Sequence, residues 1–321
     1  MLAEATLTPH VTDCWSVTRG AGAVLAVVDA NVCIEDHPAF ARRTLPGYRG
    51  ATPPGVRLSG AWRTHGAKVA GLACADSAYV MGVAPEARVL PISIPTLDSS
   101  SATADALRWA ADNGADVLCC AWTSDLSNEA GGSRTETPAA LDYCLTHGRL
   151  GKGCVVVFAA GNDGREIGHN AYASHAGVIT VGACNCHAKH PAYSNWGDAL
   201  WCVFPANDPD VSGGASMSYK TTAPVGSLLL GESFYSSAFG FTSAASAIVA
   251  GICALIVSAN PDLTSSDVRG VLRAACEPID IENGTYDARG HSPFYGFGRP
   301  DIGRAVRLAQ RYAEKTPSMS V

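Results

Sequence analysis

Short apolar runs alternate with amphipathic helical patterns along most of the 321 residues, and this alternation constrains the fold more than any other feature of the sequence. The runs are continuous and rich in β-branched residues, which is typical of strands buried on both faces of a parallel sheet. We expect such strands at residues 23–28, 87–94, 116–121, 154–160 and 178–183. Helices are expected at 103–113 and 138–147, each followed by a glycine. The sequence therefore predicts a three-layer α/β/α fold around a mainly parallel central sheet.

The last third of the chain predicts three further helices. The first is long and apolar, covers about 242–259 and is stopped by Asn260-Pro261. The second runs to about residue 275, and either Thr264 or Ser265 can cap its start. The third covers 301–313.

The chain contains no linker that would divide two hydrophobic cores. We therefore expect one domain over residues 1–314, followed by a disordered tail over 315–321. Two segments, 30–63 and 206–238, are long, rich in turn residues and weakly periodic. Because the second contains several large apolar side chains, we predict that it forms a lid over the substrate. A disordered surface insertion is the alternative.

The composition excludes several classes of protein. Hydrophobic residues make up 47% and charged residues only 16% of the chain, against a typical charged fraction of ~25%, so a large core is expected and disorder is excluded as the main state. A net charge of −6 gives no broad basic surface for a nucleic-acid partner. No apolar run approaches the ~18 residues needed to cross a membrane, so we expect no membrane span.

The cysteines and the N-terminus together indicate a compartment. Most of the 12 cysteines lie in apolar stretches, as the adjacent Cys119 and Cys120 do, and we expect them to be buried free thiols. The first fifteen residues lack the basic start and apolar stretch of a secretory signal. Both features favour the cytoplasm.

Three separated segments each place a reactive side chain at the edge of an expected element. Asp29 follows a buried strand, His65 opens a helix of small residues, and Ser243 begins the long buried helix, where free N–H groups stabilise an anion. Taken singly, each has a simpler interpretation as a turn former, a surface histidine or a helix cap. A fourth segment, Ala159-Ala160-Gly161-Asn162, ends a strand with an amide that could donate to an oxyanion.

In the order Asp, His, Asn, Ser, these four segments resemble the subtilisin-like serine proteases, and the resemblance extends over about residues 20–308. It implies a Ser-His-Asp triad in which Ser243 is the nucleophile and His65 the general base and then acid. Asp29 would fix the imidazole tautomer. Asn162 and the Ser243 N–H would form the oxyanion hole.

The resemblance also implies two substrate-binding segments. They contain Ala121, Trp122, Thr123, Ala159, Ala160 and Gly161. The family often has Ser-Leu-Gly-Gly where this chain has Ala121-Trp122-Thr123-Ser124, and because the glycines are lost we expect a narrowed pocket for the residue before the scissile bond. Equally well, Trp122 could pack in the core.

Four departures from the family pattern stand out. Phe241 replaces the glycine two residues before the nucleophile, and Lys68 replaces a second histidine. Asn31 stands where a glycine is usual. Asparagine is the non-glycine residue that best tolerates a left-handed backbone. The stretch 71–85 is short and has Asp76 as its only acid, which makes a tight calcium site there doubtful.

No cofactor or metal is expected. A Cys184-Asn-Cys186-His187 cluster with His190 has a metal-like composition, but no second ligand pair follows at zinc spacing. Gly20-Ala-Gly22 precedes its strand instead of following it, which excludes a dinucleotide-binding turn.

We therefore interpret the chain as an intracellular subtilisin-like endopeptidase whose partner is a peptide or protein substrate. Because the first strand begins near residue 23, we expect no folding pro-domain before it. Two features of the chain resemble subtilases that remove leader or follower segments from ribosomally made peptides, as in cyanobactin-type pathways. They are the short 71–85 stretch and Ser194-Asn-Trp-Gly197. A peptide macrocyclase and an inactive subtilase that only binds peptides are the alternatives.

Overall fold

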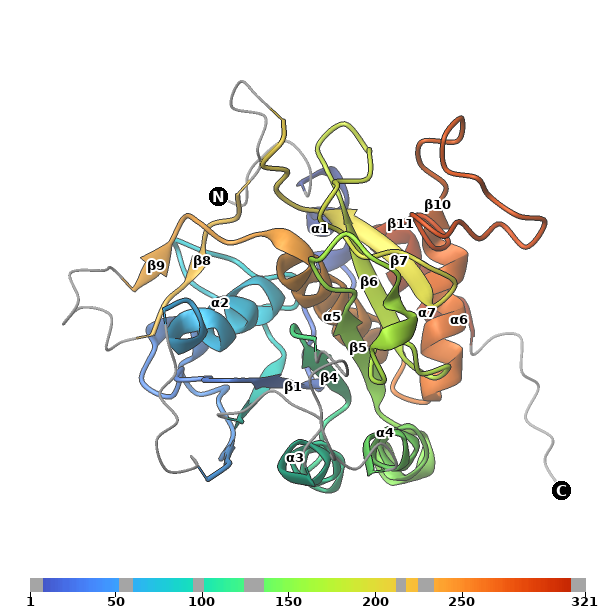
Figure 1. The fold of residues 1–321 in the computed structure, drawn as a ribbon. Coiled ribbons are helices and arrows are strands. Elements are labelled where there is room, and N and C mark those ends of the chain that lie inside the picture. The colour runs from blue at the N-terminus through green and yellow to red at the C-terminus, as the bar shows by residue number, and fades with distance from the viewer. Residues whose placement is uncertain are drawn as a thin grey trace, which may run out of the picture.

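A central parallel sheet organises the computed structural model, which describes residues 8–51, 60–94, 101–123, 136–211, 218–224 and 234–312. In these residues seven strands pair in the order β2-β3-β1-β4-β5-β6-β7 (Figure 1). The strands are β1 Val24–Asp29, β2 Tyr48–Arg49, β3 Arg88–Ser93, β4 Val117–Cys120, β5 Val155–Ala159, β6 Ile179–Cys184 and β7 Leu200–Pro205. Every neighbouring pair is parallel. The predicted three-layer α/β fold is confirmed.

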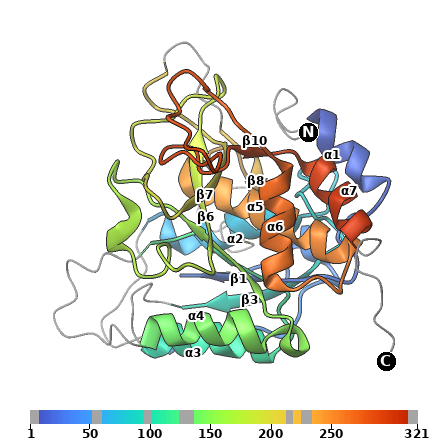
Figure 2. The same cartoon turned by 90° about the vertical axis from the view of Figure 1, so that its right-hand side faces the viewer.

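Helices cover both faces of the sheet, as the views in Figures 1 and 2 agree. One face carries α3 (Ser101–Asp112) and α4 (Glu136–His147), which lie side by side. The other carries α1 Thr8–Trp15, α2 Trp62–Cys74, α5 Phe241–Ala259, α6 Ser265–Ala275 and α7 Ile302–Tyr312. Two hydrophobic cores result, one on each face, because successive strand residues such as Leu25 and Ala26 point to opposite sides.

Short elements complete the structure. Within the described residues, the 3₁₀ helices are η1 Pro38–Phe40, η3 Arg149–Gly151 and η4 Ile167–His169. Two small antiparallel pairs join β8 Thr221–Thr222 with β9 Tyr235–Ser236, and β10 Cys276–Glu277 with β11 Arg299–Pro300. At the start of α6, Thr264 forms a reciprocal capping box with Asp267, so Thr264 and not Ser265 is the cap.

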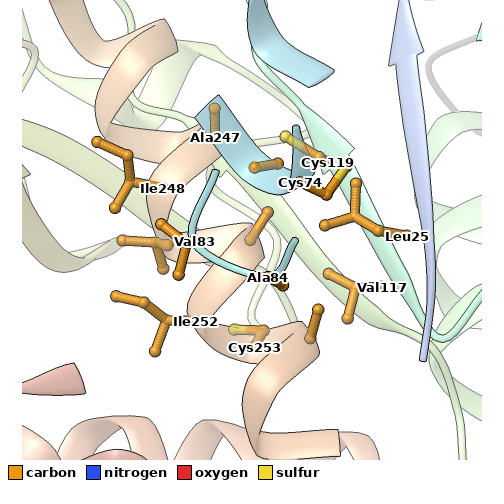
Figure 3. Close-up of a cluster of buried hydrophobic side chains, with 14 of the residues drawn as sticks. Leu25, Cys74, Val83, Ala84, Val117, Cys119, Ala247, Ile248, Ile252 and Cys253 are labelled. Atoms are coloured by element: carbon orange, nitrogen blue, oxygen red, sulfur yellow. The ribbon is translucent and has the colours of Figure 1, made fainter. Parts of the chain in front are cut away.

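Helix α5 is the centre of the larger core. In Figure 3, Ile248 and Ile252 of this helix lie beside Val83, and Cys253 lies on the side of the helix toward Val117 of the sheet. By length and composition α5 could also cross a membrane, although 89% of its apolar window is buried inside the protein. The expectation that no segment reaches that length was wrong, because the interior serines and glycine do not interrupt the helix.

The structure adds two elements that the sequence did not predict. Helix α1 and the edge strand β2 were missed because, with eight and two residues, they carry little periodicity.

The predicted lid over 206–238 needs one correction. Tyr219, part of this segment, is a core residue that is 1% exposed, and its hydroxyl donates to the Pro205 carbonyl at 2.7 Å. Residues 212–217 and 225–233 of that lid lie outside the described residues, as does the tail 313–321. The lid and the single-domain boundary stay predictions.

The cysteines follow the expectation from their apolar surroundings. All twelve are free, and all but Cys33 and Cys186 are buried. Burial raises the pKa of the Cys74 thiol to about 12, and it also raises that of Cys119, next to the carboxyl end of β4. These thiols therefore stay protonated and do not act as nucleophiles.

Candidate active site

The candidate residues gather where the strand order reverses. The chain leaves β1 toward β3 at one side and returns at β4 on the other, so the carboxyl ends of β1 and β4 flank a switch point. Ligand groups in open parallel sheets lie at this crevice. Asp29 is the last residue of β1, Ala121 follows β4, and the first turns of α2 and α5 meet there.

Asp29, His65 and Ser243 form a continuous hydrogen-bonded chain. The Asp29 carboxylate is fully buried and its Oδ2 lies 2.8 Å from His65 Nδ1, while its Oδ1 accepts from the Ala30 N–H at 2.8 Å. Because the carboxylate can only accept, Nδ1 carries the proton and Nε2 presents its lone pair. His65 Nε2 lies 3.1 Å from Ser243 Oγ. In the resting geometry this hydroxyl donates to the Ala121 carbonyl at 2.9 Å.

Small residues let α2 approach β1 closely enough for this chain. A Cβ on Gly66 would lie 2.4 Å from the Asn31 carbonyl oxygen and 2.9 Å from Asp29 Cβ. Asn31 does not adopt a left-handed backbone; instead its amide donates to the Arg63 carbonyl at 2.6 Å and ties the β1 loop to the start of α2. The glycine next to His65 thus sets the Asp29–His65 distance.

The first turn of α5 leaves one backbone donor for a ligand. Asn207 Oδ1 accepts from the Phe241 N–H at 2.5 Å, Asn162 Oδ1 accepts from the Thr242 N–H at 3.1 Å, and Gly240 accepts from the Ala244 N–H. Within the described part of the chain, no group accepts from the Ser243 N–H. A helix start with one unsatisfied N–H beside the nucleophile is an anion site.

Asn162 is oriented so that it can complete this anion site. Its Oδ1 also accepts from the Thr242 hydroxyl at 2.8 Å, so the carbonyl side of the amide is held against α5 and the NH₂ side is the donor. The Asn162 side chain is exposed and lines the same cavity as Ser243. The two donors belong to different elements and can bind one oxyanion.

Phe241 has a left-handed backbone conformation of the kind that glycine adopts without strain. Its φ is +59°, a region that costs an L-residue about 1–2 kcal/mol. The preceding Gly240 has no space for a side chain, since a Cβ would lie 1.9 Å from Asn207 Oδ1. The Phe241 ring is 41% exposed and packs edge-on against Tyr193 at 4.8 Å. Tyr193 in turn donates to the Asn207 carbonyl at 2.7 Å, and burial raises its pKa.

A cavity of about 360 Å³ opens beside the triad. It is lined by Ala61, Trp62, His65, Lys68, Asn162, Asn207, Ser218, Ala238, Phe239, Gly240, Phe241 and Ser243. The His65 ring forms its inner wall, with the Trp62 ring at 4.8 Å on one side and Phe239 at 5.3 Å on the other. The nucleophile therefore faces a space with aromatic walls.

The two predicted substrate-binding segments lie outside this cavity. The side chains of Ala121, Ala159 and Ala160 are at most 1% exposed, so only their backbone can meet a peptide. Trp122 is 2% exposed, contacts Phe158 and Tyr172 at ring distances of 5.1 and 5.0 Å, and donates to the Val28 carbonyl. Of the two interpretations of Trp122, packing in the core is correct, because the indole finds both apolar neighbours and a hydrogen-bond acceptor there.

Thr123 and Asn195 border a second, much smaller space of about 10 Å³. Gly161 has φ +105°, and a Cβ there would lie 2.3 Å from Asn195 Nδ2. Asn195 also accepts from the N–H groups of Asp163 and Arg165 through its Oδ1. The segment that carries Asn162 is thereby fixed by one amide side chain.

Metal ligands do not converge at this site. Among the described residues, no group of three or more His, Cys, Asp or Glu side chains could hold a metal ion, and this includes the cluster around Cys186. The Asn185 amide in that cluster donates instead to Asp208. Asp76 lies 3.9 Å from Arg19.

Sequence reasoning missed the residues that support the site. Asn207 follows β7 and Asn195 lies in the turn before that strand, and each satisfies backbone groups of a segment far away in the sequence. The position of Asn207 after a buried strand was an available signal. Trp62 lies three residues before His65 on α2, so its helical spacing was also an available signal. Phe239 gave no signal, because it is 174 residues from His65 in numbering.

Comparison with known proteins agrees with this geometry. The model of the subtilase family matches residues 20–298. A calcium-dependent protease of Nostoc sp. is 37% identical over 325 residues, which cover 94% of this chain and 48% of the relative. Thermitase of Thermoactinomyces vulgaris is 29% identical over 88% of this chain and 90% of its own length. The chain spans about half the length of the first of these relatives.

Solved structures show the same fold. A protease from Pseudoalteromonas arctica superposes with a TM-score of 0.73 at 22% identity, covering 96% of each chain. The prenylagaramide maturation protease PagA gives 0.69 at 25% identity, covering 93% of this chain and 98% of PagA. The resemblance stated from the four motifs is confirmed. With its family model matched over most of its length, this chain belongs to the subtilase family of serine proteases.

Proposed function

We propose that this protein is a serine endopeptidase that hydrolyses peptide bonds through an acyl-enzyme on Ser243. The observation that carries the proposal is the buried chain from Asp29 through His65 to Ser243, with distances of 2.8 and 3.1 Å. Membership of the subtilase family supports it. The protonated buried thiols leave the serine as the nucleophile at this crevice.

In the first step, Ser243 Oγ attacks the substrate carbonyl carbon and its proton passes to His65 Nε2. The hydroxyl must first rotate from the Ala121 carbonyl to the imidazole, which lies at a similar distance. The carbonyl oxygen becomes an oxyanion that accepts from the Ser243 N–H and the Asn162 amide. Asp29 stabilises the resulting imidazolium.

In the second step, His65 gives the proton to the leaving nitrogen, the C–N bond breaks, and the acyl group stays on Ser243. Water then attacks the acyl-enzyme, again with His65 as the base, and the second product leaves as a carboxylic acid. The acyl part of the peptide would lie along the backbone of 121–123 and 159–161. The leaving part would lie in the cavity beside Trp62 and Phe239.

We further propose a selective processing role in a reducing compartment. PagA, at 25% identity, is named a maturation protease, and the free, largely buried cysteines fit a reducing compartment such as the cytoplasm. The substrate class would be a precursor peptide from which a leader or follower segment is removed.

The Nostoc relative is named a calcium-dependent protease, yet for this chain we propose no tight calcium site in residues 71–85. Asp76 is the only acid of that stretch and has Arg19 beside it. A high-affinity calcium site needs several oxygen ligands that converge.

The test is labelling with a fluorophosphonate, which reacts with an activated serine. Wild-type protein should be labelled and should cleave members of a diverse synthetic peptide library, as read by mass spectrometry. Ser243→Ala should lose both while its circular dichroism stays unchanged. Ser246→Ala removes a buried hydroxyl from the same helix and should keep both activities, since its hydroxyl only donates to the Ser243 carbonyl. Labelling of Ser243→Ala at the wild-type rate would refute the proposal.

The same library separates hydrolysis from macrocyclisation. A cyclised product is one water lighter than the hydrolysed one. Products that are predominantly cyclic would replace the hydrolase by the transamidase that shares its acyl-enzyme.

A further inference from the structure

We propose that the cavity beside the triad recognises a carboxylate on the leaving segment of the substrate, and that Lys68 is the residue that determines this specificity. The inference rests on the proposed function and adds a substrate feature to it. Its basis is the composition of the cavity: Lys68 is the one formally charged side chain among the described lining residues.

Helical spacing places Lys68 in line with the catalytic imidazole. Trp62, His65 and Lys68 are three residues apart along α2, so they lie on one face of the helix. All three line the cavity. The Lys68 position is therefore within one helical turn, about 5 Å, of a substrate group that is bound beside His65.

The backbone of Lys68 is firmly held. Its carbonyl accepts from the Thr221 hydroxyl at 2.6 Å, and the neighbouring Ala67 carbonyl accepts from the Thr222 hydroxyl at 2.6 Å. These bonds fix α2 against β8. A Cβ on Gly71 would lie 2.2 Å from Thr221 Oγ1, so the contact is also sterically close. The lysine therefore extends from a rigid base into the cavity.

The charge of Lys68 has no counter-ion in the part of the chain that the structure describes. Lys68 forms no ion pair there, and the cavity lining contains no acidic side chain. The nearest functional acid, Asp29, is fully buried behind His65 and bonded to it. Asp208, next to the lining residue Asn207, accepts from Asn185 and is 6% exposed.

The aromatic walls strengthen the attraction for an anion. Trp62, Phe239 and Phe241 add apolar surface to the cavity that Lys68 lines, and charge interactions grow as the surroundings become less polar. A carboxylate in this cavity would gain the lysine as its partner without displacing another acid. The carboxylate could be the side chain of Asp or Glu after the scissile bond, or the free C-terminus of a short leaving segment.

The test compares paired peptides taken from a substrate found in the synthetic library. One pair has Glu or Gln after the scissile bond and an amidated C-terminus. The other has a short leaving segment that ends in a free carboxylate or an amide. We expect wild-type kcat/KM to be about tenfold higher for the charged member of at least one pair, which corresponds to ~1.4 kcal/mol. The pair that responds identifies the source of the carboxylate.

Variants assign the effect to the lysine. Lys68→Gln should bring the ratio close to one, Lys68→Arg should retain it, and Lys68→Glu should reverse it in favour of a Lys-containing peptide. Lys220→Gln removes the same charge from an exposed position beside β8 that does not line the cavity, and it should leave the ratio unchanged. Fluorophosphonate labelling of Lys220→Gln should stay at the wild-type rate. Because the ratio compares two peptides on the same variant, a change in the labelling rate of a Lys68 variant does not alter it.

Two results would overturn the inference while the proposed function stands: cleavage by wild type with no preference in either pair, or a preference that persists in Lys68→Gln. If no library peptide is cleaved although the variants are folded, the proposed function fails and this inference fails with it. The two failures are therefore distinguishable.

Discussion

The two sides of Ser243 differ in how they are filled. On the side where the acyl part of a substrate would lie, Trp122, Phe158 and Tyr172 pack ring against ring, and a space of about 10 Å³ borders Thr123. On the leaving-group side the cavity measures about 360 Å³ and contains a lysine. In the described residues, then, the acyl side is densely packed and the leaving side has room to select. Selectivity should respond most to changes on the open side.

Trp122→Ala should give the largest effect, because it removes the side chain that fills the closed side. Loss of a fully buried tryptophan costs roughly 3–5 kcal/mol, which for a chain of this length lowers Tm by about 5 °C or more. Trp122→Phe, which loses only the hydrogen bond to Val28 and part of the ring, should cost much less. Differential scanning calorimetry measures both. An unchanged Tm in Trp122→Ala would contradict the picture of a densely packed acyl side.

Asn162→Ala tests the boundary between the two sides. The amide is one of two donors for the oxyanion, and its loss should reduce kcat by about 10²–10³ while KM changes little. Asn113→Ala, which removes an exposed amide just after α3 that donates to the Trp109 carbonyl, serves as the control and should leave kcat unchanged. Equal losses in the two variants would show that the effect of Asn162 is structural.

Phe241→Gly should separate backbone strain from the shape of the open side. Glycine relieves the positive φ but loses the ring contact with Tyr193, so we expect Tm to change by no more than about 2 °C. Phe241→Ala keeps the strained φ and also loses the ring, and should be about 1 kcal/mol less stable than Phe241→Gly. This order is the reverse of the usual preference for alanine in helices. Alanine proving the more stable would mean that φ +59° carries no strain.

Chelation should give the smallest effect, and it tests whether either side depends on a metal. We expect EDTA to shift Tm by less than about 2 °C, since ~1 kcal/mol already moves Tm by that amount in a chain of this size. The measurement is a thermal scan with EDTA and a parallel scan with EDTA and excess calcium. A large drop that calcium reverses would place a calcium site in this protein.

Local patterns were sufficient for the fold and for the identity of the reactive residues. Short apolar runs rich in β-branched residues indicated buried strands, and the longer apolar run ahead of Asn260 indicated a buried helix. The helix stops at Gly114 and Asn260 are local effects of backbone conformation and capping. Asp29, His65, Asn162 and Ser243 could be chosen because four ordered motifs occur together. Each motif alone had an ordinary structural interpretation.

Tertiary structure decided which residues line the site and which support it from outside. That Trp122 fills the core and does not line a pocket depends on Phe158 and Tyr172, which come from other segments. Asn207 orders the turn before the nucleophile from a position 34 residues away. Such contacts depend on how strands and helices pack in three dimensions, and sequence spacing carries no information about them.

The sequence by itself determined a parallel α/β fold and the set of groups that can attack a carbonyl, because hydrophobic periodicity and residue chemistry are local properties. Only the tertiary structure decided which side of Ser243 is closed, which N–H of α5 stays available, and that Lys68 and Phe239 face one cavity. The physical reason is that cavities and unsatisfied donors are what remains after all other groups have packed.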